Sequence, residues 1–180
     1  RMTGAWDLSQ VLHHAAQISV PLSVENPSET FSVNSEGFLN VLEAARVHGC
    51  RVVYASSSAV YGDLPEFPKS ETSPTAPLSP YGLSKLENEQ RASLYWRLYG
   101  VPTVGLRYFN IYGPRQDPKG AYAAVIAAWG EAFRSGNRPV VHGDGSATRD
   151  FCFVEDVVEA NLLAATTDDP RVPGEVFNIA

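Results

Sequence analysis

The chain has 180 residues, 44% of them hydrophobic, which suits one domain of ordinary size with a core of its own. A formal net charge of −6 without a basic run argues against a nucleic-acid surface. We see no signal peptide and no apolar span of membrane length. Cys50 and Cys152 match no zinc or redox spacing, and the adjacent His13 and His14 suit a metal poorly. We expect a soluble cytoplasmic protein with reduced thiols, no metal, no membrane partner and no nucleic-acid partner.

Short apolar runs alternate with amphipathic helical segments, which is typical of a parallel α/β sheet. The run from Val11 to Ala16 predicts the first strand, followed by a polar loop. A helix is expected from about Asn34 to Val47, closed by Gly49 at its C-terminus. The segment from Arg51 to Ser56 reads as a strand covered on both faces.

The second half of the chain begins with a proline-rich stretch from Asp63 to Ser79, which predicts a long ordered loop. A helix then runs from Pro80 to about Tyr99 and stops at Gly100. The further elements expected are a strand over Thr103–Phe109, a helix over Tyr122–Arg134, a short strand over Pro139–His142, a helix over Glu155–Thr166 and a strand over Val176–Ile179.

Tyr81 and Lys85 are four residues apart and therefore share one face of the predicted helix. An ammonium beside a phenol favours the phenolate, so the pair can provide a general base. Ser79 reads as the N-cap, which places Tyr81 in the first turn, where the helix dipole also favours negative charge. The competing interpretation is a surface tyrosine that happens to precede a lysine.

A glycine-rich turn between a strand and a helix does not occur anywhere in the sequence, neither as Gly-x-Gly-x-x-Gly nor as Gly-x-x-Gly-x-x-Gly. The chain also opens with Arg1 rather than methionine and enters its first predicted strand within about ten residues. We therefore expect it to be a piece of a longer protein.

Five segments, taken together with the Tyr81–Lys85 pair, carry a resemblance to a known family. They are His13–Gln17, Asn34–Asn40, Tyr54–Gly62, Arg107–Arg115, and Gly143–Gly145 followed by Arg149–Phe151. In this order they resemble the extended short-chain dehydrogenase/reductases, specifically the NAD-dependent nucleotide-sugar epimerase/dehydratase family.

This resemblance implies a doubly wound parallel sheet of Rossmann type that lacks its N-terminal strands and its C-terminal end. Residues 1–112 would be the C-terminal part of the NAD-binding domain, and residues 113–180 the start of the substrate-binding region with returning strands. The glycine-rich turn and the acidic ribose ligand would be missing. The strand starting at Val11 would then have a bare edge.

The resemblance also implies a reaction at C4 of a nucleotide sugar. Tyr81, as phenolate, would take the proton of the 4-hydroxyl while C4 gives a hydride to NAD. Lys85 would lower the tyrosine pKa and bond the nicotinamide ribose. Ser57 would bridge the 4-oxygen and the tyrosine, with Ser58 as the fallback. Return of the hydride to the other face gives a 4-epimer, with UDP-glucose or a UDP-N-acetylhexosamine as substrate.

Two related activities and one inactive alternative remain. Sugar 4,6-dehydratases resemble this pattern but carry an Asp-Glu pair at the positions of Ser58 and Ala59. A serine hydroxyl is a poor acid near neutral pH and alanine has no proton to give, so dehydration is disfavoured. Decarboxylases of nucleotide-sugar acids are the harder rival. As a third possibility, the chain is a fragment that keeps the catalytic residues but cannot hold NAD.

The cofactor contacts implied by the family are Ala15, Ala16, Gln17, Asn34, Ser56, Tyr81, Lys85 and Tyr108. Ordinary strand packing is the alternative for the residues from Ala15 to Gln17. For Asn34 the alternative is a plain helix cap.

The implied substrate contacts are Ser57, Ser58, Asn110, His142 and Arg149. Asn110 can bond a phosphate oxygen and a sugar hydroxyl, or it can be a turn residue after a strand. Arg149 carries several N–H donors in a geometry suited to a diphosphate. The alternative is that Arg149 forms a surface salt bridge with a neighbouring aspartate. His142 would place its ring against the nucleotide base, or it is a loop residue.

A homodimer is implied through the helices starting near Asn34 and Tyr81, which pair with their copies in a four-helix bundle in this family. Leu83, Leu86, Leu94 and Leu98 give the second helix more apolar surface than one contact needs. Glu87 and Glu89 on the same helix are expected to form a solvated face.

Overall fold

The structure, a computed structural model, describes residues 9–118, 125–141 and 143–180. Its main sheet has four parallel strands in the order β1–β2–β3–β6. These strands are β1 (Gln10–His13), β2 (Arg51–Ser57), β3 (Thr103–Tyr108) and β6 (Val176–Ile179). The parallel sheet with helices between its strands confirms the expected α/β class.

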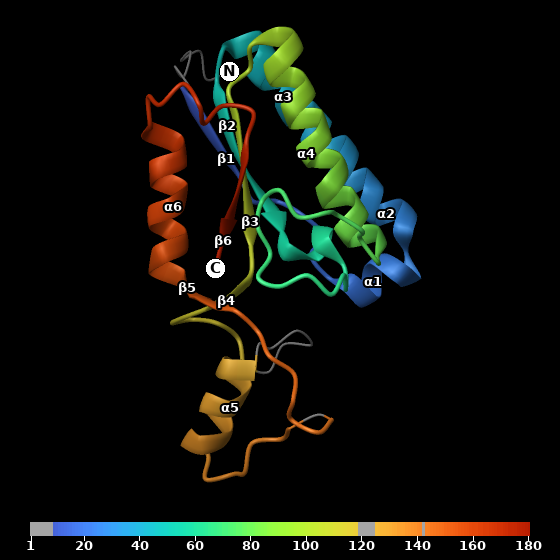
Figure 1. The fold of residues 1–180 in the computed structure, drawn as a ribbon, viewed down its shortest axis with the longest axis vertical. Coiled ribbons are helices and arrows are strands. Elements are labelled where there is room, and N and C mark those ends of the chain that lie inside the picture. Colours follow the sequence, from blue (N-terminus) through green and yellow to red (C-terminus); the bar gives the residue numbers. More distant parts are fainter. Residues whose placement is uncertain (1–8, 119–124, 142) are drawn as a thin grey trace, which may run out of the picture.

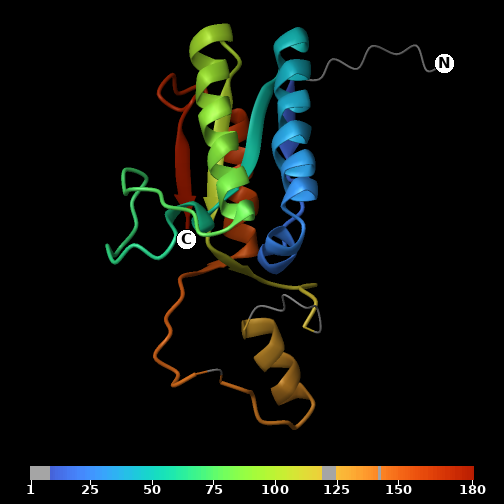
Figure 2. The same cartoon turned by 90° about the vertical axis from the view of Figure 1, so that its right-hand side faces the viewer.

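Helices cover both faces of the sheet (Figure 1). One layer holds two long helices side by side, α3 (Gly37–His48) and α4 (Pro80–Tyr99), and the other layer holds α6 (Val154–Thr166). Figure 2 shows the α3–α4 pair in front of the sheet, with α5 (Val125–Arg134) beyond the carboxyl ends of the main strands. These carboxyl ends are where open parallel sheets bind ligands.

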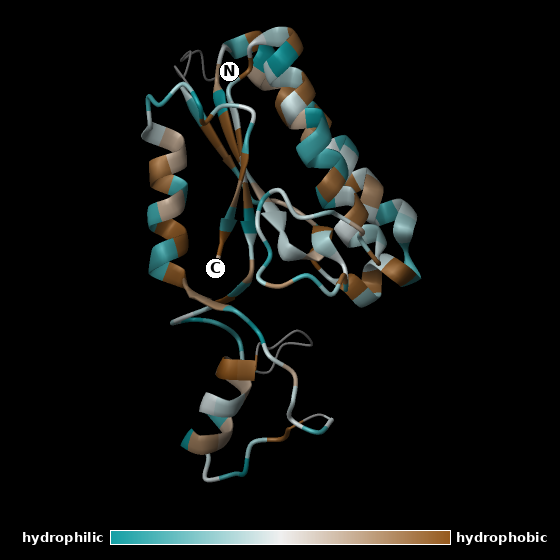
Figure 3. Ribbon diagram, viewed as in Figure 1, coloured by the Kyte–Doolittle hydropathy of each residue, from teal (hydrophilic) through white to brown (hydrophobic). Residues whose placement is uncertain are grey.

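The core forms because β2 is apolar on both faces, as the hydropathy colouring shows (Figure 3). Val52 and Tyr54 pack under α3 and α4, against side chains such as Phe38. Val53 faces the other layer, where it clusters with Leu106 of β3 and the end of α6. Alternate residues of one strand therefore hold both helix layers.

The expected ends of α4 are confirmed by their caps. The Ser79 hydroxyl accepts a hydrogen bond from the Gly82 amide at 3.0 Å, and Pro80 is the first helical residue. Gly100 ends the helix with a φ of 67°, a left-handed conformation that glycine adopts without strain. These caps fix where Tyr81 lies relative to the sheet.

The prediction of a polar loop after the first strand is wrong in part. Strand β1 ends at His13, and the following residues form α1 (Val20–Glu25), α2 (Pro27–Phe31) and a π-helical turn over Ser32–Glu36. Ser19 and Asn26 cap the two short helices through their side chains, and each helix has a proline in its first two positions. Such cap–proline pairs are a helix-start signal that apolar periodicity alone overlooks.

The prediction of a strand over Pro139–His142 is wrong for residues 139–141. These residues have no strand partner among the described residues. Instead, the Val140 carbonyl accepts a hydrogen bond from the Trp129 indole of α5 at 3.0 Å. The start expected for this helix, at Tyr122, lies outside the described residues. A small parallel pair that we did not expect, β4 (Asn110–Tyr112) with β5 (Phe151–Phe153), extends from the end of β3.

Two further findings concern the chain as a whole. None of the described helices is both long and apolar enough to cross a membrane. Cys50 and Cys152 are buried, and neither forms a disulfide within the described part of the chain.

Candidate active site

The candidate site lies where β2 and β3 end and α4 begins. Ser57 is the last residue of β2, Tyr108 is the last residue of β3, and Tyr81 stands in the first turn of α4. All three line one cavity of about 370 Å³, together with Lys85 and apolar side chains from the loop after β1, from β4 and from α6. The structure thus brings the predicted catalytic residues Ser57, Tyr81 and Lys85 into one pocket.

Lys85 is held under Tyr81. Its ammonium lies 5.8 Å from the centroid of the Tyr81 ring and donates a hydrogen bond to the Ala55 carbonyl of β2 at 2.9 Å. Only 4% of the lysine is exposed, and this burial lowers its pKa to about 8. Burial also raises the pKa of Tyr81, and a side-chain interaction with Ser57 offsets part of this rise.

The expected lowering of the Tyr81 pKa by Lys85 stays a prediction, because burial is the largest influence on this pKa here and raises it. Tyr81 and Lys85 share one helix face, as expected, but that face packs against β2. Desolvation disfavours the charged form of both groups and is the largest cause of the pKa shift of each. Burial therefore favours the neutral hydroxyl of Tyr81 in this environment.

Burial of Lys85 predicts that the chain becomes more stable as the pH rises. Between pH 8 and pH 10.4 the unfolded chain binds a proton at Lys85 that the folded chain has lost, so the free energy of unfolding increases with pH. From pH 7.5 to pH 9 we expect a gain of about 1 kcal/mol relative to the Lys85→Met variant. Urea unfolding of both proteins at the two pH values measures this difference. Parallel pH dependences would show that Lys85 is not desolvated.

A hydrogen-bonded cluster surrounds Tyr108, and two of its members, His14 and Tyr108, line this cavity. The Tyr108 hydroxyl lies 3.0 Å from Nε2 of His14 and accepts a hydrogen bond from Asn161 of α6 at 2.8 Å. The His14 and Tyr108 rings stack at 6.0 Å with an interplanar angle of 8°. Tyr108 was expected at the cofactor, but His14 and Asn161 were not expected in the site. Only the parallel pairing of β1, β2 and β3 brings them together.

The residues from Ala15 to Gln17 form the loop after β1, and Asn34 holds this loop in place. The Asn34 side chain accepts from the Gln17 amide at 2.8 Å and donates to the Gln17 carbonyl at 2.9 Å. It also donates to the Ser84 hydroxyl of α4 at 3.1 Å. Asn34 is 1% exposed and does not cap a helix. Its amide is thus fully engaged within the chain, and it could influence a cofactor only by positioning the loop.

Loss of the hydrogen bonds between Asn34 and this loop should lower the stability of the fold. Asn34→Ala leaves the Gln17 amide and carbonyl without their partner, and we expect it to lower the free energy of unfolding by about 2–3 kcal/mol. Asn40→Ala is the matched control, because Asn40 is exposed on α3 and alanine favours helix. Equal stability of the two variants in chemical denaturation would contradict the role given to Asn34.

Ser56 of β2 and Glu89 of α4 are bonded to each other. The buried Ser56 hydroxyl donates to the Glu89 carboxylate, while Ser56 also lines the smaller cavity, so its contact with the cofactor stays a prediction. Glu89 was expected on a solvated face but is 7% exposed and ion-paired with Arg107 of β3 at 2.7 Å. Glu87 is half-buried and accepts from the Ser35 hydroxyl at 2.8 Å. The expected solvated face is therefore wrong, because α4 has neighbours on both sides.

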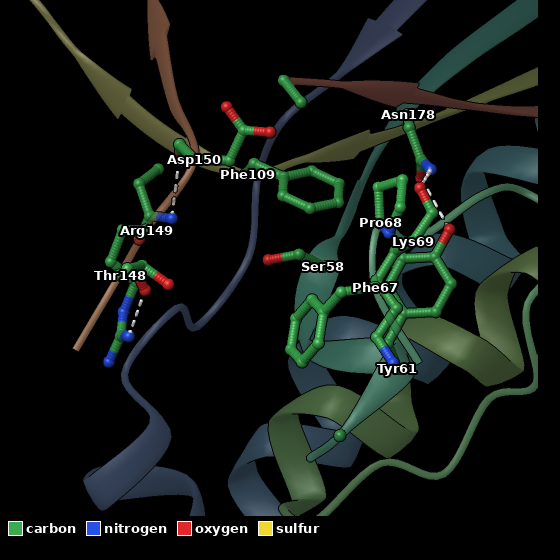
Figure 4. A pocket seen from close by; sticks show the side chains of 13 residues that line it. Ser58, Tyr61, Phe67, Pro68, Lys69, Phe109, Thr148, Arg149, Asp150 and Asn178 are labelled. Carbon is green, nitrogen blue, oxygen red and sulfur yellow. Dashed lines mark hydrogen bonds between the residues drawn. The ribbon is translucent and has the colours of Figure 1, made fainter. Parts of the chain in front are cut away.

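A second and larger cavity, of about 800 Å³, adjoins the first. Figure 4 shows its lining, which comes from the turn after β2, the proline-rich segment, the start of β4, the residues just before β5 and the end of the chain at β6. Ser58, Asn110 and Arg149, three of the expected substrate contacts, all line it. Phe109 lines both cavities and therefore stands between them.

The donors of this larger cavity are in part engaged with neighbouring backbone. The Asn110 amide donates to the Asp150 carbonyl at 2.9 Å, and the Arg149 guanidinium donates to the Thr148 carbonyl at 2.6 Å. Among the described residues Arg149 forms no ion pair with Asp144 or Asp150, so the salt-bridge alternative is not supported. His142 lies outside the described residues.

The nicotinamide cofactor implied by the resemblance can be tested against the smaller cavity. Apolar side chains such as Ile18 and Val157 face polar groups at Tyr81, Lys85 and Tyr108 there, a lining suited to a flat ring with a polar edge. The residues present therefore fit the nicotinamide end of NAD. A glycine-rich turn for the pyrophosphate does not occur in the sequence, so the chain fits only this end.

Comparison with known proteins agrees with this geometry. A family model described as the NAD dependent epimerase/dehydratase family matches residues 4–180. A putative UDP-glucose 4-epimerase of Methanocaldococcus jannaschii is 48% identical over 160 residues, which cover 88% of this chain and 52% of the relative.

Two solved structures are also similar. A UDP-N-acetylglucosamine 4-epimerase from Methanobrevibacter ruminantium M1, in complex with UDP-N-acetylmuramic acid, has a TM-score of 0.89 at 38% identity, covering 96% of this chain and 55% of that one. A Thermus thermophilus UDP-glucose 4-epimerase in complex with NAD has a TM-score of 0.82 at 42% identity, covering 96% and 56%. The chain thus spans about half the length of the proteins that it matches.

Proposed function

The chain belongs to the NAD-dependent epimerase/dehydratase family, and from this we propose that the whole protein is a UDP-sugar 4-epimerase. The observation that carries the proposal is the meeting of Ser57, Tyr81 and Lys85 in one pocket. A larger polar cavity adjoins this pocket at Phe109. A sugar lying across the boundary would have its C4 beside Tyr81 and its nucleotide in the larger cavity. Two similar proteins act on UDP-glucose or UDP-N-acetylglucosamine according to their descriptions, which supports a UDP-hexose as substrate.

In this proposal each catalytic residue has a distinct task. Tyr81 takes the proton of the sugar 4-hydroxyl, and Ser57 orients that hydroxyl by hydrogen bonding to it. Lys85 anchors the helix turn beneath Tyr81 through the Ala55 carbonyl and contributes positive charge. NAD, when bound, supplies the acceptor for the C4 hydride and a positive charge that favours ionisation of Tyr81. The 4-keto sugar then turns over and takes the hydride back at C4 on its other face, while Tyr81 returns the proton to the 4-oxygen.

The side chains next to Ser57 favour epimerisation over dehydration. Ser58 lines the larger cavity, and the amide of Ala59 donates to the Ser57 hydroxyl at 3.2 Å. Neither residue supplies the acid and base that elimination of water from C5 and C6 requires. A nucleotide-sugar decarboxylase remains the alternative, because it shares the oxidation at C4.

A direct test incubates the whole protein with NAD and either UDP-N-acetylglucosamine or UDP-glucose. We expect a 4-epimer from at least one of them, identified by its proton NMR spectrum. A 4-keto-6-deoxy sugar as product would show a dehydratase instead. Release of carbon dioxide from a UDP-uronic acid, without epimerisation of either hexose, would favour the decarboxylase.

The proposal extends to the cofactor, the domains and the cell compartment. Residues 1–112 would complete an NAD-binding domain and residues 113–180 would begin the substrate-binding region. The alternative of a fragment that cannot hold NAD predicts that the isolated chain purifies without it and gains no thermal protection from it. A cytoplasmic location is supported by the two buried thiols, which suit a reducing compartment.

A homodimer through α3 and α4 is also part of the proposal. Leu39 of α3 and Leu94 and Leu98 of α4 are 37%, 42% and 62% exposed, which leaves apolar surface on both helices. We expect Leu94→Glu to halve the mass measured by light scattering, because a buried charge opposes helix pairing. Val158→Glu, at an apolar position of α6 that is 54% exposed, is the control. An unchanged mass for both variants would contradict this interface.

A further inference from the structure

An ion pair that the proposed reaction does not use lies buried behind the site. Glu89 of α4 and Arg107 of β3 are 7% and 5% exposed. The Arg107 guanidinium donates to both carboxylate oxygens, from Nε to Oε1 at 2.9 Å and from Nη2 to Oε2 at 2.7 Å. The Ser56 hydroxyl of β2 donates to Oε1 as well. Both carboxylate oxygens are therefore satisfied.

The third guanidinium nitrogen of Arg107 reaches toward the larger cavity. Nη1 donates to the Tyr61 hydroxyl at 2.7 Å and to the Glu71 carbonyl at 3.2 Å. The Tyr61 hydroxyl in turn donates to Oδ1 of Asn178 at 2.6 Å, the contact drawn in Figure 4. Tyr61 and Asn178 both line the larger cavity. The ion pair is thus connected to the cavity wall through two hydrogen bonds.

Asn178, at the cavity end of this connection, also binds the proline-rich segment over residues 63–79. This segment has no helix or strand of its own. The Asn178 amide donates to the Lys69 carbonyl at 3.2 Å, and the Asn178 backbone N–H donates to the Glu71 carboxylate at 2.8 Å. Lys69 and its neighbours Phe67 and Pro68 line the larger cavity. The shape of this cavity therefore depends on contacts that begin at Arg107.

The other end of the network lies next to the catalytic residues along α4 and β2. Glu89 lies one helical turn after Lys85, on the face of α4 that also carries Tyr81. Ser56, which Glu89 binds, directly precedes Ser57. The ion pair therefore contacts the strand that ends in Ser57 and the helix that carries Tyr81 and Lys85.

A buried ion pair of this kind adds little net stability compared with a well-packed apolar pair, whereas a fully satisfied polar network can specify one geometry. We propose that Glu89 and Arg107 are positioning residues that set the placement of Ser57 and Tyr81 together with the wall of the larger cavity. In so far as the larger cavity is a substrate site, this inference rests on the proposed function. The Glu89–Arg107 pair would thus link the two cavities through buried side chains of the core, without a bound ligand between them.

The test replaces the pair in the whole protein by Glu89→Leu together with Arg107→Met. Because both charges leave together, we expect the melting temperature to stay within about 5 °C. Hydrogen exchange of backbone amides over residues 63–79 should rise about tenfold. With a UDP-hexose the kcat should fall about 100-fold, since a small displacement of reacting groups has effects of that size.

A second variant, Tyr61→Phe, removes one hydroxyl and leaves the ion pair in place. It should raise exchange over residues 63–79 and raise the KM, with kcat within about twofold of the starting protein. Glu87→Gln is the matched control, because Glu87 lies on the same helix and its carboxylate pairs with Ser35 and Arg91 rather than with the buried network. It should change none of these quantities.

The proposal is overturned if the double variant retains both the exchange and the kcat of the starting protein. It is equally overturned if Glu87→Gln produces the same changes as Tyr61→Phe. Absence of epimerase activity in the starting protein would refute the proposed function alone. The exchange experiment uses no substrate and would still decide whether the ion pair holds the cavity wall.

Discussion

Tyr81→Phe is expected to lower the kcat of the whole protein by about 10³-fold, because it removes the group that exchanges a proton with the sugar 4-oxygen. The free energy of unfolding should change by less than about 1 kcal/mol, since the substitution removes the interaction of the hydroxyl with Ser57 and leaves the ring in place. Steady-state rates with a UDP-hexose, together with urea unfolding, separate these two effects. The KM should change little.

The control for this prediction is Tyr99→Phe, at the other end of the same helix, where the side chain is 53% exposed. It should leave kcat unchanged. Retention of more than about a tenth of the activity by Tyr81→Phe would show that another group performs the proton transfer.

Arg107→Met alone is expected to lower the free energy of unfolding by about 3–5 kcal/mol. The substitution leaves the Glu89 carboxylate buried with only the Ser56 hydroxyl as a partner, and an uncompensated buried charge is strongly unfavourable. Addition of Glu89→Leu should restore most of the loss, because the second change removes that charge. Chemical denaturation of the two single variants and the double variant gives the interaction energy directly.

Arg91→Met is the control for the Arg107 prediction. Arg91 forms a wider ion pair with Glu87, at 3.9 Å, and both side chains are about one third exposed. Its loss should cost less than about 1 kcal/mol. If Arg107→Met were as mild as Arg91→Met, the buried network would not be the organising contact that its geometry indicates.

Local signals made much of the site predictable from the sequence. The Ser79 cap, Pro80 and the four-residue spacing determine that Tyr81 and Lys85 share a helix face, whatever the rest of the fold does. Likewise, the apolar run of β2 followed by serines places Ser57 at the carboxyl end of a buried strand. The parallel sheet follows from the alternation of such runs with helices.

Other parts of the site depend on contacts between distant segments and carry no local signal. Glu89 looks like a solvated residue until Arg107, 18 residues later, is placed against it by the pairing of β2 with β3. Asn178 reaches the larger cavity only because β6 pairs with β3. The burial of Tyr81 and Lys85 is a further example, because spacing shows the neighbouring ammonium but not the loss of water around both groups.

The central claim is that one carbon of a UDP-hexose is oxidised and re-reduced beside Ser57, Tyr81 and Lys85, with NAD as the acceptor and donor of the hydride. A UDP-hexose deuterated at C4 tests it most directly when it is incubated with the whole protein and NAD in ordinary water. The account predicts a 4-epimer that keeps its deuterium at C4, as seen by mass and NMR spectra. Loss of the deuterium to water with inversion at C4, or a 4-keto-6-deoxy product, would contradict it.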